Sequence, residues 1–301
     1  MIRPRAEITP ARVADHYDEL DPIYRRIWGD HVHHGLWETG RESPALAVRR
    51  LVGRVAGAGG FRPGDSVCDI GCGYGATARE LARNHRLRVT GITLSAVQFD
   101  YASRRAARDA RVEIRLGDWL ANDFADRSFD GAIAIESTEH IADKERCFAE
   151  MRRVLRPGGR VVICAWLASD EPRNWHVRHL LEPICREGRL AGMATAREYR
   201  AWLERAGLDP IGFDDLSDRV RRTWTICIRR FLGALPRDRA LRRYLWAATS
   251  RNRVFAATRF RIRLAYAAGA MRYGLFVAVR PSDATPHAAG QASSGANSAS
   301  S

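Results

Sequence analysis

The sequence predicts an α/β fold in which helices cover both faces of a doubly wound, mostly parallel sheet. Short apolar segments alternate with helical patterns between residues 66 and 166. The first of these segments leads directly into a glycine-rich turn, VCDIGCGYG at residues 67–75. Strands that alternate with helices pair in parallel through right-handed crossovers. The length of 301 residues allows one such core together with an accessory lobe.

The elements of this core follow one another in order. A helix is expected at 43–59, with Ser43 as its N-cap and Pro44 at its first position. Strands are expected at 66–70, 87–92, 112–116, 129–135 and 160–166. Helices are expected between them at 76–84, from Ser95 as N-cap towards Arg108, and at 144–154. The PGG sequence at 157–159 predicts a sharp turn into the fifth strand.

The regular alternation ends after residue 166. Residues 170–195 are polar and mixed, a helix at 195–206 ends at Gly207, and residues 208–225 could supply a strand. Residues 226–272 have a helical pattern, and Pro281 stops a closing strand at 274–279. The last residues are rich in Ser, Ala and Gly and are expected to be disordered. We therefore expect an N-terminal segment at 1–42, a core at 43–169, a helical lobe at 170–272 inserted before the last strand, the closing strand at 273–281 and a tail at 282–301.

Composition restricts the classes of function. The formal net charge is +14, yet Lys144 is the only lysine among the 49 Lys and Arg residues. Such one-sided use of arginine is more typical of genomic base composition than of a nucleic-acid binder, and no clustered binding motif accompanies it. The six cysteines form no CxxC pair and have no zinc-like spacing with histidine, so a reducing, cytoplasmic location is expected. The first ten residues lack the apolar stretch of a signal peptide, and no segment has the apolar length of a membrane span.

The glycine-rich turn is the first candidate site. Gly71, Gly73 and Gly75 let the backbone pass close to a ligand at the carboxyl end of the first strand, where α/β folds bind ligands. The same turn could join strand to helix without binding anything, and dinucleotide folds also carry glycine-rich turns. The GxGxG spacing and the acid Asp69 favour a cofactor with a cationic amino group and a sulfonium, because Asp69 would repel a pyrophosphate.

The ends of the next three strands carry further candidates. After the second strand, GITLSAVQ at 91–98 supplies Thr93, Leu94, Ser95 and Gln98 in place of an acid that binds a ribose, and Ser95 can also act as a plain N-cap. After the third strand, Asp118 can accept the exocyclic amine of an adenine and Trp119 can pack on its face, or Asp118 can be a turn residue. After the fourth strand, ESTEH at 136–140 either places Glu136, Glu139 and His140 in the same crevice or caps the next helix.

These motifs together resemble those of class I S-adenosylmethionine (SAM)-dependent methyltransferases. VCDIGCGYG, GITLSAVQ, GDW at 117–119 and LRPGG at 155–159 stand in the order and spacing of that family across residues 61–168. The resemblance implies a Rossmann-like, seven-stranded sheet with SAM as cofactor. It implies cofactor-binding residues at Asp69, Gly71, Gly73, Gly75, Thr93, Leu94, Ser95, Gln98, Asp118, Trp119 and Glu136.

A narrower likeness covers most of residues 15–281. YDELDPIYRRIWGDHVHHGLW at 17–37, ESTEHIADK at 136–144, the AW of CAWLAS at 164–169 and YGLFVAVRP at 273–281 resemble the γ-tocopherol methyltransferase-like group. That group includes plastid tocopherol C-methyltransferases, indole-alkaloid N-methyltransferases and bacterial natural-product methyltransferases. It implies that residues 17–37 close over the cofactor as a lid, with Tyr17, Trp28, His33 and Trp37 lining the site. Sugar O-methylating relatives tend to carry an acid where this sequence has Trp166, so a small aromatic or prenylated acceptor is expected.

Methyl transfer from SAM mainly requires alignment, together with removal of a proton where the acceptor carries one. His140 is the expected base, with Glu139 orienting it or Glu136 facing the cofactor, because a histidine of near-neutral pKa can take a phenolic or hydroxyl proton. His140 could instead only order its loop. The histidines at 31, 33 and 34 have only Asp30 nearby to complete a metal site, so no metal is expected.

Several alternatives stay open at the level of sequence. A nucleic-acid methyltransferase is the first, although neither an NPPY-type motif nor a cysteine-nucleophile motif is found, and no nucleic-acid partner is expected. An NAD(P)-dependent oxidoreductase and a non-catalytic SAM-binding protein could use the same layout. The arginines between 229 and 272 could seat the helical lobe peripherally on an anionic membrane, or only solvate it. The acceptor, the methylated atom (carbon, nitrogen or oxygen) and the oligomeric state are not fixed by the sequence.

Overall fold

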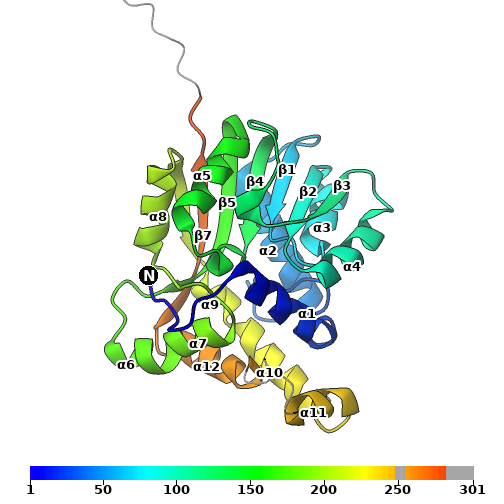
Figure 1. Ribbon diagram of the computed structural model, residues 1–301, viewed down its shortest axis with the longest axis vertical. Coiled ribbons are helices and arrows are strands. Elements are labelled where there is room, and N and C mark those ends of the chain that lie inside the picture. Colours follow the sequence, from blue (N-terminus) through cyan, green and yellow to red (C-terminus); the bar gives the residue numbers. More distant parts are fainter. Residues whose placement is uncertain (248–251, 253–254, 283–301) are drawn as a thin grey trace, which may run out of the picture.

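A single seven-stranded sheet organises the part of the chain that the computed structural model describes, residues 1–247, 252 and 255–282. Its strands run in the order β3-β2-β1-β4-β5-β7-β6 (Figure 1). Their bounds are β1 Ser66–Ile70, β2 Arg88–Thr93, β3 Val112–Leu116, β4 Phe129–Ile135, β5 Leu155–Ala168, β6 Asp209–Asp215 and β7 Met271–Val279. Strands β1 to β5 are parallel, and only β7 runs against its neighbours β5 and β6. The expected doubly wound, mostly parallel sheet is confirmed.

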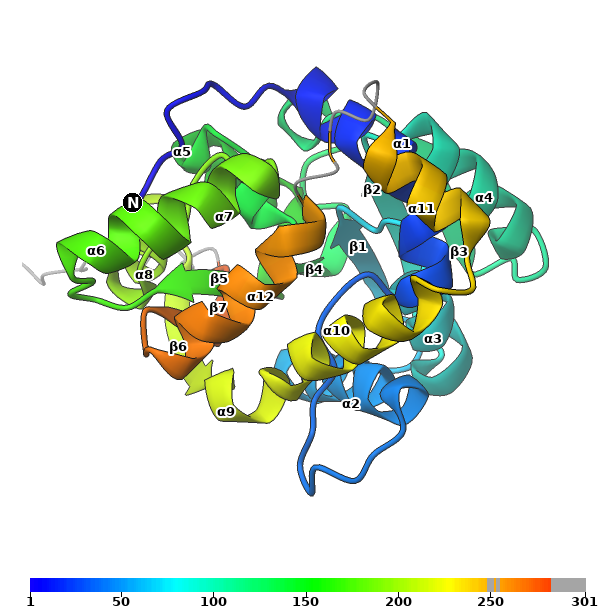
Figure 2. The same ribbon diagram turned by 90° about the horizontal axis from the view of Figure 1, so that it is seen from below.

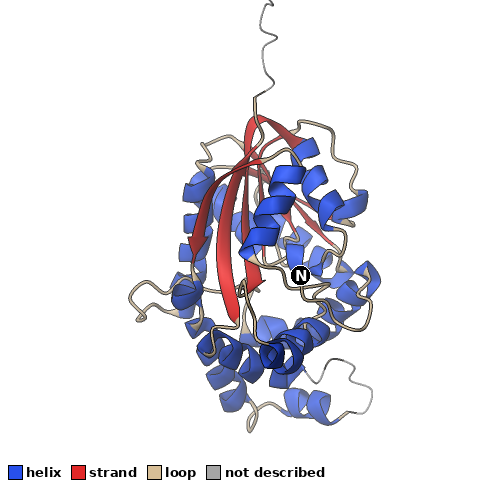
Figure 3. Ribbon diagram, turned by 90° about the vertical axis from the view of Figure 1, so that its left-hand side faces the viewer, coloured by secondary structure: helices blue, strands red, loops and turns tan. Residues whose placement is uncertain are grey.

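Helices cover both faces of this sheet (Figure 3). One face packs on α2 (Pro44–Gly59) and α3 (Ala76–His85), and the other packs on α5 (Lys144–Val154) and α8 (Ala196–Arg205). Neighbouring residues of a strand point to opposite faces, so Val67 belongs to the first apolar cluster and Cys68 to the second. The helix α4 (Ala96–Ala106) packs on β3 at the sheet edge.

Local sequence signals place most of these elements correctly. The bounds of β1, β3, β4 and α5 agree with the expected ranges, and the side chains of Ser43, Ser95 and Thr195 cap α2, α4 and α8 as N-cap residues. The PGG sequence lies inside β5 rather than before it, because β5 begins at Leu155. Gly158 has a φ of 79°, and the register of β4 against β5 shifts between Phe129 and Gly131, so the expected turn is an irregularity within a longer strand.

The segment that looked polar and mixed is helical. It contains α6 (Asn174–His176), the π-helical turn η3 (Val177–Leu181) and α7 (Glu182–Glu187). Leu180, Leu181, Ile184 and Cys185 are buried in the larger apolar cluster. These four residues form a short apolar stripe on a segment that also carries the charged residues Arg178, Glu182, Arg186 and Glu187, which hide the pattern in the sequence.

The helical lobe comes in two pieces around a sheet strand. Residues 170–272 were expected to form one insertion, but β6 pairs with β7, and α8 packs on α5 and β6. The second piece consists of α9 (Ser217–Val220), α10 (Arg222–Ala234), α11 (Arg239–Trp246) and α12 (Phe255–Ala267). The expected tail lies, from residue 283 onward, outside the described residues. Within the described ranges, no helix has both the length and the apolar character needed to cross a membrane.

Candidate active site

The strand order reverses between β1 and β4, and the cavity for a ligand opens at this point. Seen from the carboxyl ends of the strands, α1 (Pro10–Ile27), α7, α10 and α12 surround the ends of β1 and β4 (Figure 2). A cavity of about 220 Å³, here the cofactor cavity, lies there beneath α1. Ligands of α/β folds bind at such switch points. The predicted site residues in its wall are Tyr17, Gly71, Gly73, Thr93, Leu94, Ser95, Gln98, Asp118, Trp119, Glu136 and His140.

The glycine-rich turn forms one side of the cofactor cavity. Gly71 and Gly73 have φ angles of 76° and 53°, which favour glycine. A Cβ on Gly71 would lie 2.4 Å from the Cβ of Ser137, so this glycine lets two strand ends approach. A Cβ on Gly73 would meet nothing nearer than Gln98 Nε2 at 3.9 Å, so this position is open towards the cavity. Gly75 is the N-cap of α3 and lies outside the cavity wall.

Asp69 lies just behind this wall, which Ile70 and Gly71 form. The carboxylate is buried, and its Oδ2 has no hydrogen-bond partner among the described residues. Burial raises the pKa of Asp69 to about 7. An unpartnered carboxylate oxygen beside a glycine turn fits a cofactor with a cationic group, because such a group would offset the cost of burying the charge.

The end of β2 joins the cavity wall to α1. Ser95 Oγ accepts a hydrogen bond from Gln98 N at 3.0 Å as the N-cap of α4, and Ser95 also donates to Asp18 of α1. Thr93 donates to Gln98 Oε1 at 3.0 Å. Ser95 therefore combines the two roles that the sequence left open, since it caps a helix and lines the cavity.

At the end of β3, Asp118 and Trp119 also have structural roles. Asp118 accepts a hydrogen bond from Leu120 N at 2.9 Å as the N-cap of the short 3-10 helix η1 (Trp119–Ala121). The buried Trp119 donates from Nε1 to the carbonyl of Cys147 at 3.1 Å. Both residues still line the cofactor cavity, so a cap and a ligand contact are compatible here.

Glu136 holds four segments together at the end of β4. It has a φ of 55°, and its carboxylate accepts hydrogen bonds from His34 N (2.7 Å), His34 Nδ1 (2.9 Å), the Tyr273 hydroxyl (2.8 Å) and Trp166 Nε1 (2.7 Å). Burial alone would raise the pKa of Glu136, but the charge and hydrogen bonds of His34 outweigh it and bring the pKa to about 2. Glu136 lines the cofactor cavity, and the hydrogen bonds of its side chain are made within the protein.

His140 is the polar group best placed to act on an acceptor. It ends the 3-10 helix η2 (Thr138–His140), and its Nδ1 lies 2.9 Å from the carbonyl oxygen of Arg189. Since a carbonyl oxygen only accepts, Nδ1 carries the hydrogen and Nε2 is the acceptor. The Tyr17 hydroxyl donates to that Nε2 at 2.9 Å. Burial lowers the pKa of His140 to about 4, so the ring is neutral at pH 7.

Glu139 does not orient His140, contrary to the expectation. Its Oε1 accepts from Trp166 N at 2.6 Å and its Oε2 accepts from the Thr138 hydroxyl at 3.2 Å. Burial raises the pKa of Glu139 to about 7. The Arg189 carbonyl, on a segment between α7 and α8, takes the orienting role instead.

A second cavity of about 40 Å³, here the acceptor cavity, adjoins the first. The two cavities share Tyr17, Val32, Glu136 and His140. Aromatic side chains supply most of the remaining wall: Tyr24, Trp28, Trp166 and Trp224. Tyr17 therefore lines both cavities, whereas Trp28 and Trp166 line the second one.

The structure places His33 and Trp37 elsewhere. Both line a third cavity of about 280 Å³, here the side cavity, between residues 28–37, α2 and α10. Trp37 Nε1 donates to the Thr223 hydroxyl at 3.0 Å, and His33 Nδ1 donates to the His34 carbonyl at 2.8 Å. Among the described residues, no cluster of three or more His, Cys, Asp or Glu side chains could hold a metal ion.

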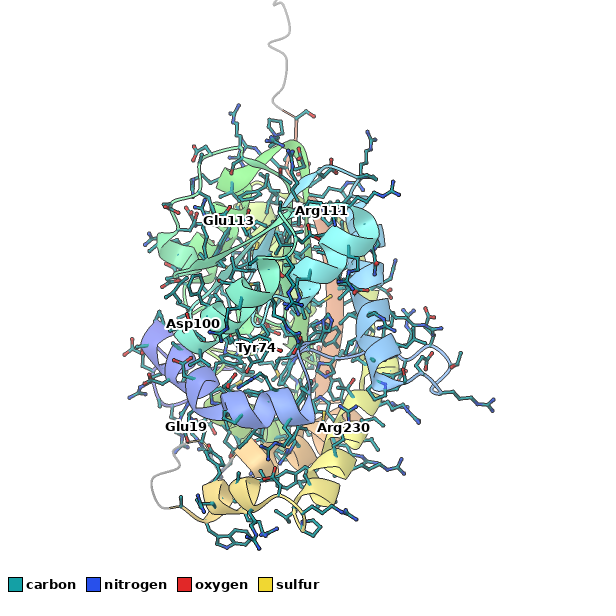
Figure 4. All side chains as sticks on the ribbon, turned by 90° about the vertical axis from the view of Figure 1, so that its right-hand side faces the viewer. Glu19, Tyr74, Asp100, Arg111, Glu113 and Arg230 are labelled. Atoms are coloured by element: carbon teal, nitrogen blue, oxygen red, sulfur yellow. The ribbon has the colours of Figure 1, made fainter. Side chains whose placement is uncertain are left out.

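The lid is anchored through buried polar contacts. Asp21 of α1 accepts from the Tyr74 hydroxyl at 2.9 Å, and Glu19 accepts from the Tyr244 hydroxyl at 2.8 Å. Figure 4 shows Tyr74 just above α1 and Glu19 on that helix. These bonds, with the one from Ser95 to Asp18, hold α1 over the cofactor cavity.

Sequence reasoning missed three of the polar partners of the site. His34, Tyr273 and the Arg189 carbonyl fix Glu136 and His140, and they come from segments far apart in the chain. Because each residue has a backbone carbonyl, the residue types do not indicate which carbonyl contacts His140. His34 did have a signal, because it stands in the WGDHVHHG stretch that packing alone explained poorly.

Comparison with known proteins agrees with this geometry. Residues 68–163 match the family model described as a methyltransferase domain. The 27-O-demethylrifamycin SV methyltransferase of Amycolatopsis mediterranei is 34% identical over 237 residues, which are 77% of this chain and 86% of that protein. The tocopherol O-methyltransferase of Arabidopsis thaliana is 30% identical over 240 residues, which are 73% of this chain and 69% of that protein.

A solved structure extends the likeness to the whole fold. The [4+2]-cyclase SpnF superimposes with a TM-score of 0.80 at 25% identity, and the match covers 94% of this chain and 100% of that one. A fold alone does not name a reaction, so the family rests on the sequence matches and on the site. With a glycine-turn cavity at the switch point and two methyltransferases related over most of its length, this chain belongs to the family of SAM-dependent methyltransferases.

Proposed function

We propose that this methyltransferase acts on a hydroxyl group of a small aromatic or prenylated acceptor, with His140 as the base. The supporting observation is the neutral His140, whose Nε2 is an acceptor at the junction of the two cavities. Transfer to carbon or nitrogen does not always need a base so placed, whereas a hydroxyl must lose its proton. Of the two relatives named above, the 27-O-demethylrifamycin SV methyltransferase acts, by its name, on an oxygen of its acceptor.

The residues of the cofactor cavity fit SAM. The open position at Gly73 and the buried carboxylate of Asp69 suit its amino acid portion, while Thr93, Ser95 and Gln98 offer neutral hydrogen-bonding groups to a ribose. Asp118 and Trp119 suit the adenine. When bound, SAM supplies a methyl group already activated for transfer by its positive sulfur.

The protein's own residues then align the acceptor and take its proton. The rings of Tyr17, Trp28, Trp166 and Trp224 hold a flat acceptor against the shared wall and exclude water. The proton passes from the acceptor oxygen to the Tyr17 oxygen while the Tyr17 proton passes to His140 Nε2. The Arg189 carbonyl keeps the other ring nitrogen protonated, so Nε2 is always the atom that receives the proton.

Two variants test this assignment once an acceptor is identified. Metabolites are compared with and without the gene for a mass difference of one methylene, and the acceptor found is assayed with purified protein. His140→Ala should lower kcat by about 10²–10⁴-fold, and Tyr17→Phe should lower it as well, while the affinity for S-adenosylhomocysteine (SAH) stays unchanged in both. Full turnover in His140→Ala would remove the base assignment.

The alternatives have their own readouts. Radiolabelled SAM is incubated with RNA and DNA, and we expect no incorporation; robust labelling would replace the small-molecule proposal. NADH should give no calorimetric signal where SAH does.

Peripheral membrane contact is proposed at α11. Trp246 is 68% exposed on this helix, beside the exposed Arg239 and Arg243. An exposed aromatic ring between arginines suits an anionic lipid surface. Phosphatidylglycerol vesicles should co-sediment the protein and phosphatidylcholine vesicles should not, and Trp246→Ala should weaken the association; equal behaviour with both lipids would contradict the contact.

A further inference from the structure

We propose that the acceptor carries an apolar arm, and that this arm binds in a row of cavities between α1 and the pair α10 and α11. The inference rests on the proposed function, because the arm extends from an acceptor head held beside His140. It names a binding site outside the cofactor and acceptor cavities.

The row begins at the wall of the acceptor cavity. Tyr24 and Trp28 line both that cavity and a middle cavity of about 20 Å³. The middle cavity shares Ile23, Leu241 and Tyr244 with an outer cavity of about 180 Å³. Consecutive cavities thus have side chains in common, from His140 to the groove between α1 and α11.

The walls of this row are mostly apolar. Leu20, Ile23, Ile27, Phe231 and Leu245 line the middle cavity. Its polar groups already have partners: Tyr244 donates to Glu19 Oε1 at 2.8 Å, and Asn252 donates from Nδ2 to Glu19 Oε2 at 2.6 Å. The buried Arg259, which also lines this cavity, lies over the Phe231 ring with its guanidinium carbon 3.6 Å from the ring centroid. A hydroxylated or charged arm would find few hydrogen-bond partners, whereas an alkyl or prenyl arm would lose only its contact with water.

The mouth of the row is formed by the outer cavity. Pro22, Ala234 and Ala240 line it, and Arg26 pairs with Asp238 at its edge. Ala240 is exposed on α11, so the row ends at the protein surface. An arm that enters here would reach the acceptor cavity past Ile23 and Leu241.

Trp28 lies between the acceptor cavity and the middle cavity, and it is the side chain that we expect to move when the arm binds. Its indole Nε1 is buried and has no hydrogen-bond partner among the described residues, so a rotation of the ring breaks no hydrogen bond of that group. Trp28 also borders the side cavity, which is the competing route. That cavity is lined by Asp30, His31, Arg49 and Glu80, and its polar wall suits an apolar arm poorly.

A pair of matched variants separates the two routes. Ala240 lies in the wall of the outer cavity and Ala45 in the wall of the side cavity, and both are exposed on helices. Ala240→Trp and Ala45→Trp should therefore fill one route each and leave the fold intact, which thermal unfolding checks. The probes are 4-ethylphenol, 4-butylphenol and 4-octylphenol below their aggregation limits, bound to the SAH-loaded protein and followed by calorimetry.

The affinity of the unaltered protein should rise with chain length, by up to about fourfold for each methylene buried. Ala240→Trp should weaken 4-octylphenol about tenfold or more and leave 4-ethylphenol unchanged, because it overfills only the arm site. Ala45→Trp should bind all three probes as the unaltered protein does. No dependence on chain length, an equal loss for both probes in Ala240→Trp, or a selective loss in Ala45→Trp would each overturn the proposal.

These measurements need no turnover. If octylphenol binds at this site as predicted but His140→Ala keeps full activity, the arm site is supported and the base assignment is wrong. If His140→Ala loses activity but octylphenol does not bind as predicted, the base assignment is supported and the arm site is wrong.

Discussion

At the scale of the residue, the reactivity of His140 is set by a carbonyl group rather than by an acid. The Arg189 carbonyl fixes the tautomer, and burial keeps the ring neutral with a pKa of about 4. An acid in that place would raise the pKa instead. If His140 is the base, as proposed, it is available at neutral pH without first losing a proton to solvent.

A dependence of the rate on pH follows from this arrangement. The neutral ring is the active form, so kcat/KM for the acceptor, measured at saturating SAM, should stay constant as the pH falls through 6.5, the ordinary pKa of histidine, and should decline only near pH 4. A pH–rate profile measures this. Glu139, with a pKa of about 7, is the control: if the profile instead declines near pH 7 and Glu139→Gln abolishes that decline, Glu139 and not His140 limits the rate.

Asp69 predicts a second dependence on pH, in cofactor binding. Its pKa of about 7 in the free protein means that a cationic amino group would meet an ionised partner only above that pH. The affinity for SAH should therefore increase between pH 6 and pH 8, and calorimetry at several pH values measures it. Asp69→Asn should bind more weakly at pH 8 and lose the dependence; a dependence that persists in Asp69→Asn would contradict the role of Asp69.

Lys144 supports the loop of His140 from below. This sole lysine is buried, and its Nζ donates to the carbonyls of Thr138 and Ile141 on either side of η2. Native protein treated with an acetylating reagent should remain unmodified at Lys144 and become modified after unfolding in urea, as mass spectrometry can show. Rapid acetylation of Lys144 in the native protein would contradict its burial. Lys144→Met should lower the free energy of unfolding by about 1–3 kcal/mol, because it removes the Nζ donor from the Ile141 carbonyl and leaves the Thr138 carbonyl with only the Ile141 backbone N–H.

At the scale of the element, α1 lines the cofactor cavity and is the lid that we propose. Its contacts with the core are few and specific, and the bond from Tyr74 to Asp21 is one of them. Removal of a hydrogen bond of about 1 kcal/mol shifts an equilibrium about fivefold. Tyr74→Phe should therefore release SAH about fivefold faster and speed amide hydrogen exchange in residues 10–27.

Tyr101→Phe is the matched control for this prediction. The Tyr101 hydroxyl donates to Asp30 at 2.8 Å, outside α1, so its removal should leave both the release rate and the exchange of α1 unchanged. Equal effects of the two substitutions would mean that the Tyr74 bond does not hold the lid.

The elements that the sequence predicted well are those with a local signal. Ser43, Ser95 and Thr195 each accept a backbone hydrogen bond within the next turn, so the residue type alone marks the helix start. The helix α7 was missed because its apolar stripe of Ile184 and Cys185 becomes visible only against the tertiary core. The long β5 was cut short because PGG usually breaks a strand, whereas here Gly158 adopts a positive φ within it.

The same distinction holds for the site. Residues at the carboxyl ends of strands, such as Gly73 and Asp118, could be placed in the cavity from their order in the chain, because parallel strands end at one edge of a sheet. The partners of Glu136 could not, since Trp166 reaches it through pairing of β5 with β4 and Tyr273 through pairing of β7 with β5. Trp37 followed the lid motif in sequence but turns towards Thr223 of α10.

At the scale of the whole molecule, the sheet supplies the cofactor site and the helices supply the acceptor site. The reversal of strand order between β1 and β4 opens the cofactor cavity, and α1 with the two helical insertions closes the acceptor cavity beside it. His140 stands where the two meet. The net charge of +14 has no part in this geometry.

The central claim is that SAM binds at the glycine-rich turn, and calorimetric titration with SAH tests it most directly. Gly73 and Gly64 both have a positive φ and room for a side chain, but only Gly73 lines the cofactor cavity. Gly64, with a φ of 94°, lies further outside the left-handed helical region than Gly73, with a φ of 53°, so Gly64→Leu is the more strained of the two variants and a stringent control. We expect SAH to bind the unaltered protein and Gly64→Leu at one site, and to give no measurable heat with Gly73→Leu. Failure of SAH to bind the unaltered protein, or equal binding to Gly73→Leu, would contradict the account.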